Sequence, residues 1–370
     1  MTDNIKKCIS IFSLTALSVI SLVGCANSND NIKDKTEKLT EKIVDENKTL
    51  TVLNYGEYID RDVLKTFQEE TGIKVLYEEA TTPEEMYAKY KGGAIDYDLI
   101  CTSEYMIEKL MGEDELMELD KDSMEYYDNI DERYLKLSES FDPGNKYSIP
   151  YFFGTIGLLY NTEKVNGPVD TWEVLFNGEY SGEIIMQNSI RDAYMCALKY
   201  KGYSLNTTNR DELDEAQKML IDQKKDVEAY FVDEVREEMV AENAAIAVCY
   251  SGEAYLANEY NSDLQFVVPK EGSNLWIDSW CITKNCRNYE GANKFLDFLC
   301  REDVAYLNFE EVYYPTPNKA VFENLDEEEQ EDPLIFPSED ALNNCEVYKI
   351  LDAETTEYMG EMWKELKVLQ

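Results

Sequence analysis

The sequence predicts an α/β fold built on a largely parallel sheet. From residue 49 onward, short apolar segments alternate with segments whose apolar residues recur at helical spacing. This alternation is typical of strand–helix–strand units, which place parallel strands side by side. The 370 residues correspond to about two domains, and the 44% of hydrophobic residues can form a sizeable core.

The first unit is the clearest. A short apolar strand is predicted over residues 49–55. The helix that follows begins at Asp60, places apolar residues on one face and ends at Gly72. A second strand is predicted over residues 74–77. These three elements would form one parallel strand pair with its connecting helix.

The next helix carries a strong start signal. Residues 82–85, Thr-Pro-Glu-Glu, combine an N-cap, a proline at the first helical position and a capping-box glutamate, and predict a helix through Tyr90. A third strand is predicted over 97–102, with Ser103 capping the helix after it. The acidic run 326–332 is expected to be a solvated loop.

The N-terminus resembles an export and anchoring signal. Two lysines precede an apolar stretch over residues 8–23, and residues 22–25, Leu-Val-Gly-Cys, look like a bacterial lipobox. In such signals the cysteine receives diacylglycerol and becomes the mature N-terminus. We expect residues 1–24 to be a lipoprotein signal peptide, Cys25 to be lipidated and 25–48 to be a flexible tether at the extracytoplasmic face of the cell membrane. An uncleaved anchor would place the rest of the chain on the same side.

Composition restricts the classes of function. The 76 acidic and 35 basic residues give a formal charge of −41, which repels nucleic-acid phosphates and attracts cations. A general role in solubility explains this charge equally well. The chain has no histidine, which removes Ser-His-Asp and Cys-His nucleophiles and His-ligated zinc. Catalysis by paired carboxylates remains open.

The cysteines give little sign of a metal site. Seven follow Cys25, an odd number that leaves at least one free thiol. Most lie in apolar runs typical of buried thiols. Cys281 and Cys286 lie five residues apart without a nearby histidine, which is a weak zinc signal. We expect no metal and no cofactor.

The predicted strand ends carry aromatic and acidic residues. Ligands of open α/β sheets bind beyond the carboxyl ends of the strands. There the sequence has Tyr-Gly-Glu-Tyr at 55–58 and Ser-Glu-Tyr at 103–105. Neither loop has the glycine-rich cradle or basic side chains that favour an anion. The residues therefore favour a cation.

Seven segments, in order, carry a family resemblance. They read Leu-Asn-Tyr-Gly-Glu-Tyr at 53–58, Phe-Gln-Glu-Glu-Thr-Gly-Ile-Lys-Val at 67–75, Tyr-Ser-Ile-Pro-Tyr at 147–151 with Gly154, Lys-Gly-Tyr-Ser at 201–204, Val-Pro-Lys-Glu-Gly at 268–272, Trp-Ile-Asp-Ser at 276–279 and Tyr-Pro-Thr-Pro-Asn at 314–318. Together they resemble the spermidine/putrescine-binding proteins of bacterial ABC importers. The similarity runs from about residue 50 to the C-terminus; each motif alone is weak, and their common register makes the match specific.

The resemblance implies a two-lobed periplasmic-binding-protein-like fold of type II, with a ligand cleft between the lobes. The first lobe would comprise 49–152 and 278–322, and the second 153–277 and 323–370. The lobes would close over a polyamine by a hinge motion, and the closed form would dock on an ABC transporter permease. The resemblance implies a binding protein without enzymatic activity, and we expect a monomer.

The family's ligand contacts carry over to nine positions. They are Tyr55, Tyr58, Ser103, Tyr105, Asp192, Tyr250, Trp276, Asp278 and Tyr314. Tyr55 and Tyr250 stand where tryptophan is usual, and Asp192 stands where a glutamate commonly contacts an amine. Two positions depart from the family: Ser189 replaces a second carboxylate found in some spermidine binders, and Tyr348 lies near a position that is often glutamine.

These residue types suit a polyamine. Aromatic faces accommodate methylene segments and attract each ammonium by about 0.5–2 kcal/mol. A buried ammonium also needs a carboxylate, because an unpaired buried charge is strongly unfavourable. Asp278 and Asp192 would supply two charges, which favours putrescine, although Glu57, Glu253 or Asp233 could supply a third.

Other interpretations remain. The same fold could bind a sugar, another organic cation or a metal chelate, and a surface glycoside hydrolase could use two carboxylates. A purely structural lipoprotein is a further alternative. Trp276 could be a core aromatic residue, Asp278 could cap a turn, and Asp192 could pair with Arg191.

Overall fold

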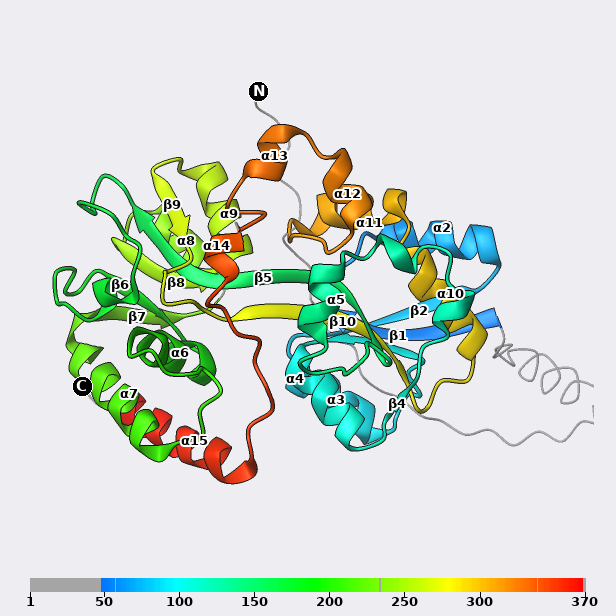
Figure 1. Ribbon diagram of the computed structural model, residues 1–370, viewed down its shortest axis with the longest axis horizontal. Helices are drawn as coiled ribbons and strands as arrows, with labels where there is room; N and C mark the ends of the chain where they lie inside the picture. The colour runs from blue at the N-terminus through cyan, green and yellow to red at the C-terminus, as the bar shows by residue number, and fades with distance from the viewer. Residues whose placement is uncertain (1–47, 57, 233, 338, 369–370) are drawn as a thin grey trace, which may run out of the picture. The chain divides into compact units, whose positions relative to one another are not determined.

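A computed structural model describes residues 48–56, 58–232, 234–337 and 339–368 (Figure 1). The predicted signal peptide, Cys25 and nearly all of the predicted tether lie outside the described residues, as do Glu57 and Asp233. Within the described ranges, no helix is both long and apolar enough to cross a membrane.

The described strands form one mixed sheet. They are β1 (Thr49–Tyr55), β2 (Lys74–Ala80), β3 (Leu99–Thr102), β4 (Leu116–Met117), β5 (Ser148–Asn161), β6 (Ile184–Gln187), β7 (Val227–Phe231), β8 (Ile246–Tyr250), β9 (Leu264–Val267) and β10 (Leu275–Thr283). Their order is β2-β1-β3-β10-β5-β8-β6-β7, with β4 beside β10 and β9 beside β5.

Helices pack around these strands. They are α2 (Arg61–Thr71), α3 (Pro83–Gly92), α4 (Glu104–Gly112), α5 (Glu132–Ser138), α6 (Ile190–Tyr200), α7 (Arg210–Gln223), α8 (Val235–Val240), α9 (Ser251–Tyr260), α10 (Tyr289–Leu299), α11 (Glu302–Val312), α12 (Lys319–Asn324), α13 (Glu327–Glu331), α14 (Glu339–Leu342) and α15 (Ala353–Val368). The C-terminal helix α15 packs against α6 and α7 (Figure 1).

The sheet joins two lobes, which confirms the expected fold. In the first lobe β1 pairs in parallel with β2 and β3, and in the second β6 pairs in parallel with β7 and β8. The centre differs from the prediction of a largely parallel sheet, because β5 and β10 are antiparallel there. β5 pairs with β10 through its first part and with β8 and β9 through its second part, and so connects the lobes (Figure 1).

The predicted first unit is confirmed. β1 and β2 pair in parallel, and α2 lies between them in the chain. Asp60 is the N-cap of α2 and accepts a hydrogen bond from the backbone N–H of Asp62. Gly72 ends the helix with a φ of 71°, a left-handed conformation that glycine adopts without steric cost.

The start of α3 differs in detail. Thr82 accepts from the backbone N–H of Glu85 as predicted, but the Glu85 carboxylate accepts from the N–H and hydroxyl of Thr81, whereas a capping box would use the N–H of Thr82. Ser103 occupies the N-cap position of α4, although its hydroxyl makes no capping bond within the described chain.

The loop prediction for residues 326–332 was wrong, because α13 covers Glu327–Glu331. Asp326 accepts from the N–H of Glu329, whose carboxylate accepts from the N–H of Asp326. This reciprocal capping box stabilises a short helix that covers most of the acidic run.

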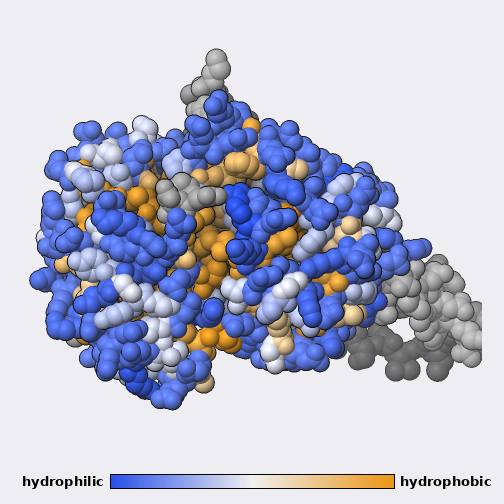
Figure 2. Space-filling model, viewed as in Figure 1, coloured by the Kyte–Doolittle hydropathy of each residue, from blue (hydrophilic) through white to orange (hydrophobic). Residues whose placement is uncertain are grey.

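Each lobe has its own apolar core. In the first lobe Phe67 contacts Phe295, and Trp280 packs edge-to-face on the Phe295 ring. The second-lobe core surrounds Trp172 and Tyr194. Figure 2 shows mainly polar residues at the periphery of this face and apolar residues at its centre, near the crossing strands.

Candidate functional site

Asp278 lies on β10 at an irregularity of the sheet. The register between β10 and β5 shifts between Asp278 and Ser279, and such shifts redirect side chains. Oδ2 of Asp278 accepts a 2.9 Å hydrogen bond from the Tyr58 hydroxyl. Burial raises the pKa of Asp278 to about 7, and the bond from Tyr58 opposes that rise. A partly desolvated carboxylate of this kind is stabilised in its charged form by a cation.

Aromatic rings surround this carboxylate. The ring of Tyr58 packs edge-to-face with Tyr55 at 5.3 Å and with Tyr314 at 6.2 Å between centroids. The Trp276 ring lies 5.0 Å from that of Tyr314, also edge-to-face. The structure thus brings four predicted aromatic residues together next to Asp278. Their faces can accommodate an apolar or cationic ligand segment.

Asp192 belongs to a second polar group, in the other lobe. It lies in the first turn of α6 and is only 3% exposed. Its oxygens each accept a 2.9 Å hydrogen bond, one from the Tyr250 hydroxyl and one from the Tyr348 hydroxyl. Burial raises the pKa of Tyr250 and Tyr348, and the adjacent Asp192 charge adds to the rise. Both hydroxyls are therefore fixed donors to this carboxylate.

The suggested Arg191–Asp192 pair is not formed in the described structure. The Arg191 guanidinium donates to the Lys349 carbonyl and to Oδ1 of Asn206. It also lies over the Tyr348 ring, 4.3 Å from its centroid. Arg191 therefore holds the Tyr348 segment.

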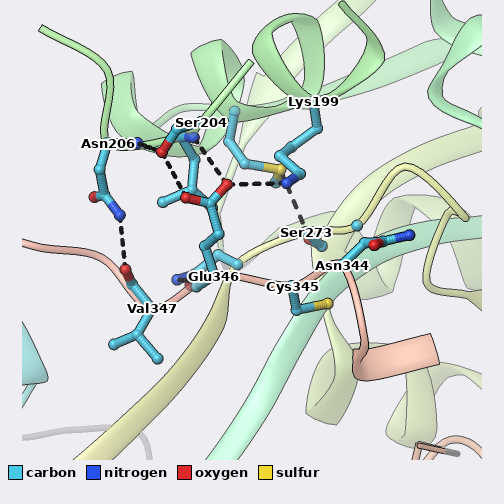
Figure 3. A network of polar contacts seen from close by, with 12 residues as sticks. Lys199, Ser204, Asn206, Ser273, Asn344, Cys345, Glu346 and Val347 are labelled. Atoms are coloured by element: carbon cyan, nitrogen blue, oxygen red, sulfur yellow. Dashed lines mark hydrogen bonds and ion pairs between the residues drawn. The ribbon is translucent and has the colours of Figure 1, made fainter. Parts of the chain in front are cut away.

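A polar network fixes the segment that carries Tyr348. In Figure 3, the Glu346 carboxylate points toward Lys199 and Ser204 of the second lobe, with distances of 2.9 Å to Nζ and 2.5 Å to the hydroxyl. Asn206 donates to the Val347 carbonyl. Burial alone would raise the pKa of Glu346, but Ser204 and Lys199 lower it below its usual value. This network helps position Tyr348 beside Asp192.

The two groups meet at the start of α9, where the Tyr314 ring lies against Gly252. Tyr250 immediately precedes α9, so Tyr314 links the aromatic rings around Asp278 to the Asp192 group. The Tyr105 hydroxyl donates to Glu84, and Tyr105 also lies near Tyr55 and Tyr250, adding to the rise in the pKa of both. Ser103 is buried at the end of β3.

Glu104 is a buried acidic residue near Asp278 that was not among the predicted contacts. It is 1% exposed, and its Oε2 accepts a 3.4 Å hydrogen bond from the N–H of Ile277 on β10. Burial raises the pKa of Glu104 to about 8, Asp278 adds to the rise, and Arg191 opposes it. A glutamate in the first turn of a helix is usually solvated, and its negative charge there interacts favourably with the helix dipole. The only feature of the sequence that pointed to Glu104 was its position between the predicted ligand contacts at residues 103 and 105.

Two cysteines lie beside the site: the Asp278 charge adds to the burial that raises the pKa of Cys101, and the Cys196 thiol donates to the backbone carbonyl of Asp192. All seven described cysteines are free, and five are buried, as their apolar sequence contexts predicted. The described residues hold no group of three or more cysteine or acidic side chains placed to bind a metal ion.

The chain matches known proteins in sequence. Residues 62–337 match the family described as bacterial extracellular solute-binding protein. The chain is 34% identical over 327 residues to the spermidine/putrescine-binding periplasmic protein of Escherichia coli K12, covering 87% of this chain and 92% of the relative. It is 30% identical over 339 residues to the putrescine-binding periplasmic protein SpuD of Pseudomonas aeruginosa, with coverage of 87% and 92%.

Solved structures show the same fold. The spermidine/putrescine ABC transporter substrate-binding protein PotD of Streptococcus pneumoniae has a TM-score of 0.80 at 38% identity, covering 86% of this chain and 98% of that chain. The TpPotD lipoprotein of Treponema pallidum has a TM-score of 0.76 at 22% identity, with coverage of 86% and 99%. The chain therefore belongs to the bacterial extracellular solute-binding proteins, a family of transport proteins.

Proposed function

We propose that this protein captures a polyamine, putrescine or spermidine, outside the cytoplasm and delivers it to an ABC importer. The observation that carries the proposal is Asp278, a partly buried carboxylate with a raised pKa among the rings of Tyr58, Trp276 and Tyr314. An ammonium at Asp278 would offset the desolvation of the carboxylate, and adjacent methylenes would lie against the rings.

The second ammonium would be directed toward the Asp192 group. Both Asp192 oxygens already accept from tyrosine hydroxyls, so Tyr250 and Tyr348 would present oxygen atoms polarised by a carboxylate. Two carboxylates favour a diamine. Glu104 is a third buried acidic group, but burial raises its pKa to about 8, so it is mainly protonated at neutral pH. Glu253 already lies 3.7 Å from Arg236.

The cellular arrangement is part of the proposal. Residues 1–24 would be removed, Cys25 would carry the lipid at the extracytoplasmic face, and the closed monomer would dock on permease subunits. The lobe boundaries at 152/153, 277/278 and 322/323 are proposed with it. Mass spectrometry of the membrane-extracted N-terminus tests the anchor: a diacylated Cys25 supports it, and an intact residue 1–24 segment contradicts it.

Calorimetric titration of residues 26–370 tests the ligand. Putrescine, spermidine and spermine are compared with an uncharged sugar, on wild-type protein and on Asp278→Asn. Micromolar or tighter binding of one polyamine, lost in Asp278→Asn, supports the proposal. A folded protein freed of bound amine that binds no polyamine contradicts it, and binding of the sugar would favour the same fold with a different ligand.

A further inference from the structure

Gly252 lies under the ring of Tyr314. It is the second residue of α9 in the second lobe and is buried. A Cβ atom at this position would lie 2.3 Å from Cε1 and 2.5 Å from Cζ of Tyr314. Carbon atoms in contact lie about 3.5–4.0 Å apart. The ring therefore occupies the space that a side chain at residue 252 would need.

Tyr314 belongs to the first lobe, where its ring packs against the core and contacts Tyr58 edge-to-face. It also contacts Trp276 and, through the next residue, β5, both of which lie where the two lobes join. The carbonyl of the next residue, Pro315, accepts a hydrogen bond from the N–H of Phe153 on β5. The Tyr314–Gly252 contact thus joins a ring of the first lobe to a helix of the second.

A second glycine supports the same packing. A Cβ atom at Gly154 on β5 would lie 2.3 Å from Cζ2 of Trp276 and 3.0 Å from Oγ of Ser251. Ser251 also accepts from the N–H of Thr155, at 3.4 Å. Trp276 therefore rests on the backbone of β5 and Tyr314 on the backbone of α9, and a glycine provides the space for each ring.

Backbone conformation does not require glycine at residue 252. Its φ lies outside the left-handed region, within an ordinary helix. Glycine destabilises helices relative to alanine, so an alanine here would suit the helix taken alone. What an alanine could not accommodate is the Tyr314 ring.

We propose that Gly252 is a positioning residue for ligand capture, because its missing side chain lets Tyr314 dock on α9 and complete the aromatic wall when the lobes come together. This inference rests on the proposed function. A methyl group at residue 252 holds the ring away from α9 and leaves the site open on that side. It therefore weakens binding without weakening the ligand-free fold.

Gly252→Ala tests the inference, with Gly360→Ala as matched control. Gly360 lies within α15, and no atom outside its own helix backbone lies within 4 Å of a Cβ there in the described structure. Gly252→Ala is expected to raise the Kd for the bound polyamine at least tenfold and to leave the ligand-free Tm unchanged or higher. Gly360→Ala is expected to raise Tm and leave Kd unchanged. Wild-type affinity in Gly252→Ala overturns the inference.

A double-mutant cycle with Tyr314→Ala separates this contact from a general effect on folding. If the ring is what the methyl group displaces, Gly252→Ala has little further effect on Kd or Tm once the ring is gone. If Gly252→Ala weakens binding or lowers Tm equally with and without Tyr314, the inference is overturned. This includes the case in which Gly252→Ala misfolds in both backgrounds.

Failure of the proposed function is recognisable on its own, as a wild-type protein that binds no polyamine. The contact is then read from crystals of wild type and Gly252→Ala. A Tyr314 ring that lies on residue 252 in wild type and moves away in the variant supports the inference. A ring that does not contact residue 252 in wild type, or does not move in the variant, overturns it.

Discussion

The hydroxyl of Tyr58 donates a 2.9 Å hydrogen bond to the carboxylate of Asp278, joining residues 220 positions apart in the chain. Burial raises the pKa of Asp278 and the bond from Tyr58 lowers it, with a net value of about 7. Asp278 is therefore poised between its neutral and charged forms near neutral pH. A cationic ligand would select the charged form, and four predictions follow from this site and its supporting network.

Affinity should rise with pH between 5 and 8. Only the ionised form of Asp278 attracts an ammonium, and its pKa is about 7. The ligand amines stay protonated throughout this range, because amines of this type have pKa values of about 10. The Kd for putrescine should therefore increase roughly tenfold for each pH unit below 7. Titrations at pH 5, 6, 7 and 8 measure this, and a pH-independent Kd would contradict it.

Tyr58→Phe should weaken binding roughly tenfold at pH 7, since a hydrogen bond to a charged group contributes about 1.5–3 kcal/mol. The variant keeps the ring and loses the donor, so the pKa of Asp278 should rise and the pH midpoint of binding should shift upward. Tyr87→Phe is the control, because the Tyr87 hydroxyl donates to the exposed Glu113. Equal titration curves for wild type and Tyr58→Phe would count against the role of this bond.

Asp278→Asn should stabilise the ligand-free protein at pH 8 while abolishing binding. The pKa of Asp278 is about 7 in the folded protein, which is above its value in the unfolded chain. The bound proton therefore contributes its whole stabilisation below about pH 4, and this stabilisation is lost as the pH rises through 7. Removing the charge should raise the free energy of unfolding by about 1–3 kcal/mol at pH 8 and have little effect at pH 4. Urea unfolding at both pH values measures this difference.

The control for that experiment is Asp222→Asn, an exposed carboxylate paired with Lys218. It should change stability by less than about 0.5 kcal/mol at either pH. A destabilised Asp278→Asn at pH 8 would show that the carboxylate supports the fold more than it prepares a binding site.

Glu346→Gln should loosen the segment that carries Tyr348. Lys199 would keep a charge in a side chain that is 9% exposed, without its ionic partner. We expect a loss of about 1–3 kcal/mol in the free energy of unfolding and weaker polyamine binding through Tyr348 and Asp192. Glu354→Gln removes a pair with Arg210 in which Glu354 is 81% exposed, and it should have little effect. Equal losses in both variants would contradict the specific role of Glu346.

Local signals in the sequence predicted much of the fold. Asp60 and Gly72 bound α2 because a cap and a left-handed glycine act within a few residues. The family resemblance placed Tyr58, Trp276, Asp278 and Tyr314 in one site, and the structure brings them into one group. These predictions depended on neighbouring residues or on the order of motifs.

Long-range pairings could not be read from the sequence. Asp192 and Tyr348 are 156 residues apart, and nothing in the sequence between them indicates their hydrogen bond. In the sequence, Glu104 resembles an exposed residue at the start of a helix. In the structure it is buried and accepts a hydrogen bond from β10. The role of Gly252 depends on a ring brought from another lobe.

A crystal structure with putrescine tests the central claim most directly. The account predicts one ammonium within hydrogen-bond distance of Asp278, methylenes against Trp276 or Tyr314, and the second ammonium directed to the Asp192 group. A ligand bound elsewhere, or an ammonium at this site with no contact to Asp278, would contradict it.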